Sequence, residues 1–303
     1  MPSEPRMTIK TLACVAVALL LALPVAHAVA AETAPKPPSA PGYTMPATET
    51  WDLASDGGEV YRIFVSKPAK DSEAPEDGYP VLYVLDGNAY FGSFAQARWV
   101  AEYLSVGKAI IVGVGYPGDE AWDVRRMNDF TAPLLDPPPR QWRSLAQYKS
   151  GARKPFLDFL TGTLRAEISR RYPVDPDRHS LFGHSLGGLF ALHALYERPD
   201  AFHSIVAASP SMEWNEQGML SEERAFTARL TGGKVGKTSR LMVVVGDQDT
   251  DDDPEPARAL AERLDRLSGH GLRVRLLRYP DEVHVTVPAR SVTDVMRFAF
   301  QIR

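Results

Sequence analysis

From residue 80 to the C-terminus, short apolar runs alternate with longer segments of helical periodicity, and this alternation limits the possible folds. Residues 80–85 (PVLYVL) and 109–115 (AIIVGVG) are almost continuously apolar, as expected of strands covered on both faces. Strands are predicted over residues 59–66, 80–85, 109–115, 179–183, 204–209, 240–246 and 272–279. Helices are predicted over residues 91–104, 153–172, 186–197, 221–230, 256–267 and 288–301. Such an alternation forms βαβ units, so we expect an α/β fold with a mainly parallel sheet and helices on both faces.

The first 46 residues are not expected to belong to this fold. Arg6 and Lys10 precede an apolar run over residues 12–23, and Ala26-His27-Ala28 resembles a cleavage site. The run is shorter than the roughly 20 residues that a membrane span needs, so residues 1–28 are predicted to be a secretory signal peptide. Residues 29–46, rich in Pro, Ala and Thr, are expected to be flexible. Residues 47–303 then form one domain, with no membrane span after cleavage.

Composition excludes several kinds of function. The chain of 303 residues has one cysteine, Cys14, which lies in the predicted signal peptide. The exported protein therefore has no cysteine nucleophile, thiolate metal site or disulfide. A formal charge of −4 argues against general nucleic-acid binding. Neither a metal site nor a cofactor is predicted. The oligomeric state is left open, with a monomer as the default expectation.

The polar residues that chemistry needs follow the predicted strands. In parallel sheets the ligand site lies beyond the carboxyl ends of the strands. Those ends are followed by residues 86–88 (DGN), 183–185 (GHS), 209–211 (SPS), 246–249 (GDQD) and 280–284 (PDEVH). We therefore expect the functional groups to gather at this one edge of the sheet.

Ser185 is the candidate nucleophile. It lies in GHSLG, which matches G-x-S-x-G between a predicted strand and a predicted helix. That context is typical of the nucleophile elbow, a strained turn that exposes the serine hydroxyl above the sheet. The backbone N–H of Leu186, at the helix start, is a candidate oxyanion donor. The alternative is that Ser185 only caps the helix, but a cap does not explain Gly183 or the following glycine pair.

A serine hydroxyl needs a base, and chain position favours His284. It is the histidine that follows the last predicted strand, at the expected edge; the alternative is an ordinary surface-loop residue. The other histidines are His27, His179, His184, His193, His203 and His270. His27 lies in the predicted signal peptide, and His179, His203 and His270 lie near the opposite edge of the sheet. His184 is next to Ser185, but its side chain is expected to point away from it. His193 lies about 12 Å along the helix axis.

An acid should orient His284, and hydrolases of this fold place it between the serine and the histidine in the chain. The loop after residue 246 contains several acids. Asp249 is favoured, with Asp247, Asp251 and Glu255 as alternatives.

The second oxyanion donor should come from the turn after residue 85. The backbone N–H of Asn88, or that of Gly87, is the candidate, unless this segment is a simple turn.

These segments resemble a known family. The stretches YPVLYVLDGNAYF, RRMNDFT, DPDRHSLFGHSLGGLFALHAL, ASPSMEW and PDEVHVTVP occur in the order typical of the putative-esterase branch of the α/β-hydrolases. The chain is most similar to periplasmic esterases of catecholate siderophores such as enterobactin and salmochelin. The resemblance runs from about residue 43 to the C-terminus. It implies an α/β-hydrolase fold with Ser185 and His284 as the catalytic pair. Some exported members of the family work without a firm acid.

The resemblance also implies a substrate and a location. The substrate would be the trilactone of 2,3-dihydroxybenzoyl-serine, free or as its Fe(III) complex, hydrolysed in the periplasm to release iron. Because the ferric complex is anionic, the site should offer cations and aromatic faces. Arg126 occupies the family's arginine position, with Arg125 beside it; pairing of Arg126 with Asp129 is the alternative role. Aromatic candidates at the same edge are Trp122, Trp142, Tyr148 and Trp214, which could instead cap the core.

Other functions fit the same motifs, because fold and catalytic residues do not determine the substrate. One is a general exported carboxylesterase acting on acetyl or feruloyl esters. Another is an acyltransferase on the same fold. A third is a siderophore-binding protein with an inactive hydrolase site.

Overall fold

The structure is a computed structural model that describes residues 43–69, 74–215, 218–250 and 253–300. The predicted signal peptide and most of the segment 29–46 lie outside these residues. A compact unit begins at Thr44. None of the helices within the described ranges has both the length and the apolar character that crossing a membrane requires.

One sheet forms the centre of this unit. Its strands are β1 (Thr48–Ala54), β2 (Val60–Ser66), β3 (Tyr79–Leu85), β4 (Ile110–Gly115), β5 (Val174–His184), β6 (Ser204–Ala208), β7 (Arg240–Gly246) and β8 (Val274–Tyr279), in the spatial order β1-β2-β4-β3-β5-β6-β7-β8. The pairs β1–β2 and β2–β4 are antiparallel, and the other neighbours are parallel. The predicted α/β-hydrolase fold, with its mainly parallel sheet, is confirmed. The edge strand β1 was not predicted, because its sequence TETWDLA is largely polar and only half-buried.

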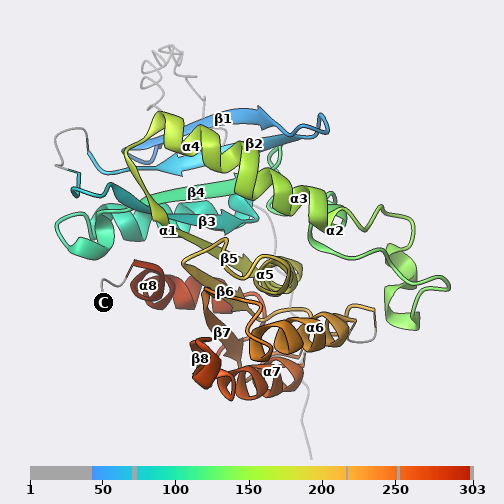
Figure 1. Ribbon diagram of the computed structural model, residues 1–303. Coiled ribbons are helices and arrows are strands. Elements are labelled where there is room, and N and C mark those ends of the chain that lie inside the picture. The colour runs from blue at the N-terminus through green and yellow to red at the C-terminus, as the bar shows by residue number, and fades with distance from the viewer. Residues whose placement is uncertain (1–42, 70–73, 216–217, 251–252, 301–303) are drawn as a thin grey trace, which may run out of the picture. The chain divides into compact units, whose positions relative to one another are not determined.

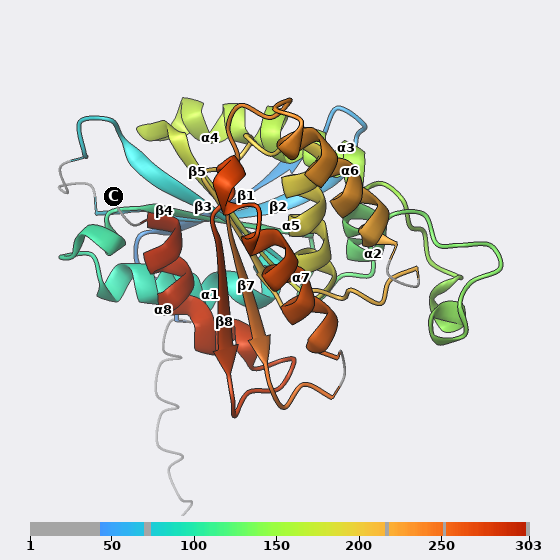
Figure 2. The same cartoon turned by 60° about the horizontal axis from the view of Figure 1, so that its bottom comes forward.

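Helices cover both faces of the sheet. They are α1 (Gly87–Val100), α2 (Arg126–Phe130), α3 (Arg153–Phe159), α4 (Arg165–Arg171), α5 (Leu186–Glu197), α6 (Met219–Thr231), α7 (Glu255–Asp265) and α8 (Val287–Phe300). A π-helical turn over Leu160–Leu164 joins α3 to α4. Helices α1 and α8 pack on one face, and α3 to α7 lie on the other (Figures 1 and 2). Most predicted helix boundaries agree within a few residues.

Side chains of β3 show why the apolar run is continuous. Val81 and Tyr83 belong to the core under α3 to α7, whereas Leu82 and Val84 belong to the core under α1 and α8. Successive residues of a strand point to opposite faces, so a strand between two helix layers needs apolar side chains at every position.

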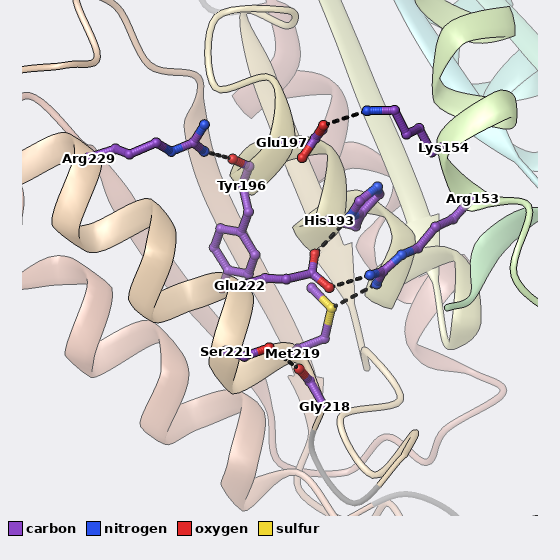
Figure 3. Close-up of polar contacts among 10 residues, drawn as sticks. All are labelled: Arg153, Lys154, His193, Tyr196, Glu197, Gly218, Met219, Ser221, Glu222 and Arg229. Atoms are coloured by element: carbon purple, nitrogen blue, oxygen red, sulfur yellow. Dashed lines mark hydrogen bonds and ion pairs between the residues drawn. The ribbon is translucent and has the colours of Figure 1, made fainter. Parts of the chain in front are cut away.

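A polar cluster connects three of the helices on the α5 face. The Glu222 carboxylate on α6 accepts a hydrogen bond from Nδ1 of His193 on α5 (2.8 Å) and also pairs with Arg153 on α3 (Figure 3). Nη1 of Arg153 contacts the sulfur of Met219 at 3.5 Å. His193 therefore packs between helices, in agreement with its exclusion as the catalytic base.

Candidate active site

Ser185 lies on a strained turn between β5 and α5. Its backbone has φ 57° and ψ −121°, a region that non-glycine residues rarely adopt, and it follows β5 directly. A Cβ atom on Gly183 would lie 2.0 Å from the carbonyl oxygen of Gly187, so the tight strand-to-helix approach requires glycine. The Ser185 side chain makes no capping hydrogen bond to the helix. The turn thus has the geometry of a nucleophile elbow, and the helix-cap interpretation is wrong.

The Ser185 hydroxyl contacts a second serine that sequence reasoning did not single out as a site residue. Oγ of Ser185 lies 3.1 Å from Oγ of Ser211, which is 4% exposed. The Ser211 backbone N–H donates to the Ser185 carbonyl at 3.2 Å, which brings the loop after β6 against the elbow. The SPS motif after a predicted strand was the available signal, but a serine pair cannot be derived from chain position alone.

His284 is paired with Asp249. Nδ1 of His284 lies 2.8 Å from Oδ2 of Asp249, and their side chains are 12% and 1% exposed. A carboxylate accepts but does not donate, so Nδ1 carries the hydrogen and Nε2 is left as the basic nitrogen. Of the alternative acids, Asp247 pairs with Arg278 and Glu255 with Arg258, while Asp251 lies outside the described residues. Among the acids that the structure describes in this loop, Asp249 is the one that pairs with His284; its role as the catalytic acid stays a prediction.

The loop that carries His284 reaches the elbow through His184. Nε2 of His184 lies 2.9 Å from the backbone carbonyl oxygen of His284, and the two imidazole centroids are 4.6 Å apart. Because His184 directly precedes Ser185, the His284 backbone lies next to the elbow, whereas the hydrogen-bond partner of Ser185 Oγ among the described residues is Ser211 and not the His284 imidazole. The catalytic roles of Ser185 and His284 stay a prediction.

The turn after β3 differs from the expectation in one respect. Helix α1 begins at Gly87 and not near residue 91, because Asp86 adopts a left-handed conformation (φ 52°, ψ 49°) and heads the helix. The backbone N–H groups of Ala89 and Tyr90 donate to the Asp86 carbonyl. Those of Gly87 and Asn88 are at the first two helical positions, where no intrahelical acceptor exists. Both predicted oxyanion donors are therefore at a helix start, as is Leu186 on α5.

Asn88 also fixes this turn to the end of β4. Its side-chain Nδ2 donates to the carbonyl of Tyr116 at 3.0 Å, and its Oδ1 accepts from the Tyr116 N–H at 2.9 Å. A Cβ on Gly115 would lie 2.0 Å from that Oδ1, so the contact depends on glycine. The side chain of Asn88 thus holds the turn, while its backbone N–H remains the candidate donor.

Arg126 and Arg125 have structural partners. Nε and Nη2 of Arg126 donate to the two carboxylate oxygens of Asp86 at 2.7 and 2.9 Å, with the side chains 13% and 1% exposed. Burial acts to lower the pKa of Arg126, but the Asp86 charge outweighs it and the pKa is raised. The partner is Asp86 and not Asp129, which instead accepts from Tyr116 Oη at 3.0 Å. Arg125 pairs with Glu59 at 3.1 Å. Substrate contact by either arginine stays a prediction.

The prediction that Trp214 offers an aromatic face to substrate does not fit the structure. Its side chain is buried, with 2% exposure, because it packs 5.0 Å from the ring of Trp142 and donates from Nε1 to the Ala132 carbonyl at 3.3 Å. The alternative, that Trp214 caps the core, is what the structure shows. Trp122 and Tyr148 are exposed at 51% and 42%.

A small cavity lies beside the His284 loop. It has a volume of about 230 Å³ and is lined by Tyr90 and Phe94 of α1, by Trp122, and by Val285 and Val292. Val285 follows His284 in the chain, and the Tyr90 hydroxyl contacts His184 at 2.8 Å. The cavity is therefore largely apolar and adjoins the loop that carries the candidate base. Among the described residues, no group of His, Cys, Asp or Glu side chains is arranged to hold a metal ion.

Comparison with known proteins agrees with this geometry. The family described as "Putative esterase" matches residues 57–275. The ferri-bacillibactin esterase BesA of Bacillus subtilis is 35% identical over 271 residues, which cover 85% of this chain and 91% of the relative. A siderophore enterobactin esterase of Emericella nidulans is 34% identical over 186 residues, 58% of this chain and 61% of the relative.

Solved structures give the same assignment. The crystal structure of the BES protein from Bacillus cereus superposes with a TM-score of 0.77 at 32% identity, covering 87% of this chain and 98% of that one. With a strained serine turn, an acid–histidine pair and this extent of similarity, the chain belongs to the putative esterase family of α/β-hydrolase-fold carboxylic-ester hydrolases.

Proposed function

We propose that this protein is a serine esterase that hydrolyses the trilactone of enterobactin-type catecholate siderophores, free or as the Fe(III) complex. The observation that carries ester hydrolysis is the Asp249–His284 pair held against a strained Ser185 turn. The choice of substrate is supported by relatives that are named as siderophore esterases, one of them over most of the chain. Iron belongs to the substrate in this proposal.

The reaction would follow the serine-hydrolase sequence. Ser185 Oγ bonds to the lactone carbonyl carbon while its proton passes to His284 Nε2. The resulting oxyanion is stabilised by backbone N–H groups at the starts of α5 and α1, with Leu186 and Asn88 as the candidates. The lactone C–O bond then breaks, and the leaving seryl alkoxide takes the proton from His284. A water molecule then gives a proton to His284 and attacks the acyl carbon, the bond from that carbon to Ser185 Oγ breaks, and His284 returns the proton to Ser185 Oγ as the carboxylic acid leaves.

Two features of the surroundings support an aryl-bearing, anionic substrate. The apolar cavity with the exposed Trp122 adjoins the His284 loop and offers a place for an aromatic ring. The segment between α2 and α3 carries Arg140, Arg143 and Lys149, all exposed, and projects beyond these helices (Figure 1). We propose that these cations, more than the paired Arg126, attract the negative charge of the ferric complex.

The decisive experiment compares substrates and identifies products. Purified protein is incubated with apo and ferric enterobactin, ferric bacillibactin and p-nitrophenyl acetate, and products are identified by mass spectrometry, with Ser185→Ala as the control. We expect linear trimer, dimer or monomer from the siderophore and none from the variant. Turnover of the small ester without siderophore cleavage would favour the general carboxylesterase, and transfer of the acyl group to a sugar would favour the acyltransferase.

The proposed cation surface has its own test. Changing Arg140, Arg143 and Lys149 together to Gln should raise KM for the ferric siderophore and leave p-nitrophenyl acetate hydrolysis unchanged. An unaltered KM for the ferric siderophore would remove these residues from substrate binding.

We also propose that the protein acts in the periplasm after removal of residues 1–28. The support is the charged start, the apolar run over residues 12–23 and the Ala-x-Ala site at residues 26–28. Cell fractionation and N-terminal sequencing of the mature protein test this directly. Recovery of the uncleaved chain from the cytoplasm would contradict the proposal.

A further inference from the structure

The residue before the nucleophile, His184, has two defined hydrogen-bond partners. It ends β5, is 3% exposed, and lies on the sheet face covered by α1 and α8. Nδ1 lies 2.8 Å from the Tyr90 hydroxyl, and Nε2 lies 2.9 Å from the His284 carbonyl oxygen. Both ring nitrogens of this buried imidazole are therefore satisfied, which makes its orientation unique.

The partners determine which nitrogen carries the proton. A carbonyl oxygen can only accept, so Nε2 of His184 must donate and carries the hydrogen. Burial, together with the neighbouring His284 and Arg126, lowers the pKa of His184 to about 3, so the ring is neutral and Nδ1 accepts from Tyr90 Oη. A neutral ring matters here, because the centroid of His284 is 4.6 Å away and a second positive charge would oppose protonation of the base.

His284 is thereby held at two points. Asp249 binds the side chain through Nδ1, and His184 binds the main chain through the carbonyl oxygen. The first contact fixes the tautomer of the imidazole and the second fixes the backbone from which it projects. The loop from Pro280 to Thr286 lies between the end of β8 and the start of α8 without regular secondary structure, and Gln248 N also donates to the Glu282 carbonyl in it. Of these contacts, only that with His184 acts on the His284 backbone itself.

We propose that His184 is a positioning residue that sets the distance between His284 and Ser185 by donating a hydrogen bond to the His284 backbone, with Tyr90 fixing its tautomer. The elbow strand then supplies both the nucleophile and the anchor of its base on consecutive residues. A displacement of the base by about 1 Å is enough to slow such a reaction by roughly 100-fold. The inference rests on Ser185 and His284 as the catalytic pair, but not on the siderophore substrate.

Two amide variants separate positioning from packing. In His184→Gln the side-chain amide reaches the place of Nε2 and can still donate to the His284 carbonyl. In His184→Asn the shorter amide reaches the place of Nδ1, keeps the contact with Tyr90 and loses the donor to His284. Both replace a buried ring by a planar amide, so they serve as matched controls for the loss of packing.

The assay uses p-nitrophenyl acetate, with the folded fraction of each variant determined by thermal unfolding so that misfolded protein does not count. We expect His184→Gln to keep kcat per folded molecule within about tenfold and His184→Asn to lose roughly 100-fold, with KM unchanged in both. Tyr90→Phe should lie between them. Equal kcat values for the Gln and Asn variants, high or low, would overturn the proposal, because the donor to His284 would then not matter.

Failure of the underlying catalytic pair gives a different result. If Ser185→Ala keeps the activity of the wild type, the catalytic assignment is wrong irrespective of what the His184 variants do. Loss of siderophore cleavage alone, with intact hydrolysis of the small ester, leaves the His184 comparison interpretable. The protein is used in its mature form throughout.

Discussion

Arg126→Ala distinguishes a structural arginine from a substrate-binding one. The substitution removes the partner of Asp86, whose side chain is only 1% exposed, and leaves a buried carboxylate without its cation. Breaking a buried ion pair from one side typically costs about 3–5 kcal/mol. At about 2–4 °C per kcal/mol for a domain of this size, we expect the melting temperature to fall by roughly 6–20 °C.

The same change should impair catalysis for every ester. Asp86 heads α1, and its Oδ2 lies 3.4 Å from where a Cβ on Gly187 would be, so the carboxylate adjoins the starts of both α1 and α5. Without Arg126, an uncompensated negative charge would oppose the oxyanion that these helix starts are expected to stabilise. Loss of oxyanion stabilisation costs about 10²–10³ in kcat. We expect such a loss on p-nitrophenyl acetate and on ferric enterobactin alike.

The neighbouring Arg125→Ala is the matched control. Its side chain is 32% exposed and its partner Glu59 is 64% exposed, so this solvated pair contributes less than about 1 kcal/mol. Arg125 also donates to the Val60 carbonyl and lies over the rings of Tyr61 and Tyr116, but its removal leaves no buried charge, so we expect a smaller loss of stability than for Arg126→Ala. Thermal unfolding and kinetics on both substrates are measured for each variant, and Asp86→Asn added to Arg126→Ala should recover part of the stability. The reasoning is refuted if Arg126→Ala keeps its melting temperature and its small-ester kcat while binding of the ferric siderophore alone weakens.

Three further substitutions test the site. Asp249→Asn should lower kcat about 10⁴-fold, because an amide favours the wrong imidazole tautomer. Asp247→Asn is the control. A loss of kcat below tenfold on the small ester would indicate a serine–histidine dyad. Gly183→Ala places a Cβ 2.0 Å from a backbone oxygen and should lower stability by about 1–3 kcal/mol or more. A Cβ on Gly162 would have nothing within 4 Å, so Gly162→Ala should not lower stability. Equal melting curves for the Gly183→Ala and Gly162→Ala variants would contradict this expectation. Burial raises the pKa of Asp129 to about 6 in the folded protein. As the pH rises from about 4 to about 6, the unfolded chain loses this proton first, so the free energy of unfolding should fall by roughly 3 kcal/mol. Asp129→Asn should flatten that slope in urea titrations, and an unchanged slope would argue against the raised pKa.

Much of this fold could be predicted because each buried strand needs apolar residues on both faces. The polar residues that follow these strands then mark one edge of the sheet. Chain order placed Ser185, Asp249 and His284 at that edge, and the structure pairs His284 with Asp249 and ties the His284 backbone to His184, the residue before Ser185. Local patterns fail where a contact depends on distant backbone. The edge strand β1 is polar, and the start of α1 depends on the close approach of Gly87 to Gly113.

Side-chain partners were the least predictable part of the site. Arg126 could have paired with the acid three residues on, but it reaches Asp86, which lies 40 residues earlier in the chain. Trp214 follows a strand tip and looked available for binding, yet it is covered by Trp142 from the long segment after α2. In both cases the partner comes from another loop, and sequence periodicity carries no information about how loops pack on one another.

The long segment after α2 carries the exposed cations that we propose contact the ferric siderophore. It is tied to the loop after β6: Asn215 Nδ2 donates to the Pro133 carbonyl at 2.8 Å, and the Leu135 N–H donates to Asn215 Oδ1 at 3.1 Å. That loop also carries Ser211, which contacts Ser185. Between these attachments and α3, Trp142 packs on Trp214 and donates to the Glu213 carbonyl, whereas Arg140, Arg143 and Lys149 are exposed. Since the candidate serine, base and acid lie after strand ends, we expect substitutions of the exposed cations in this segment to change substrate preference in this protein without changing the chemical step.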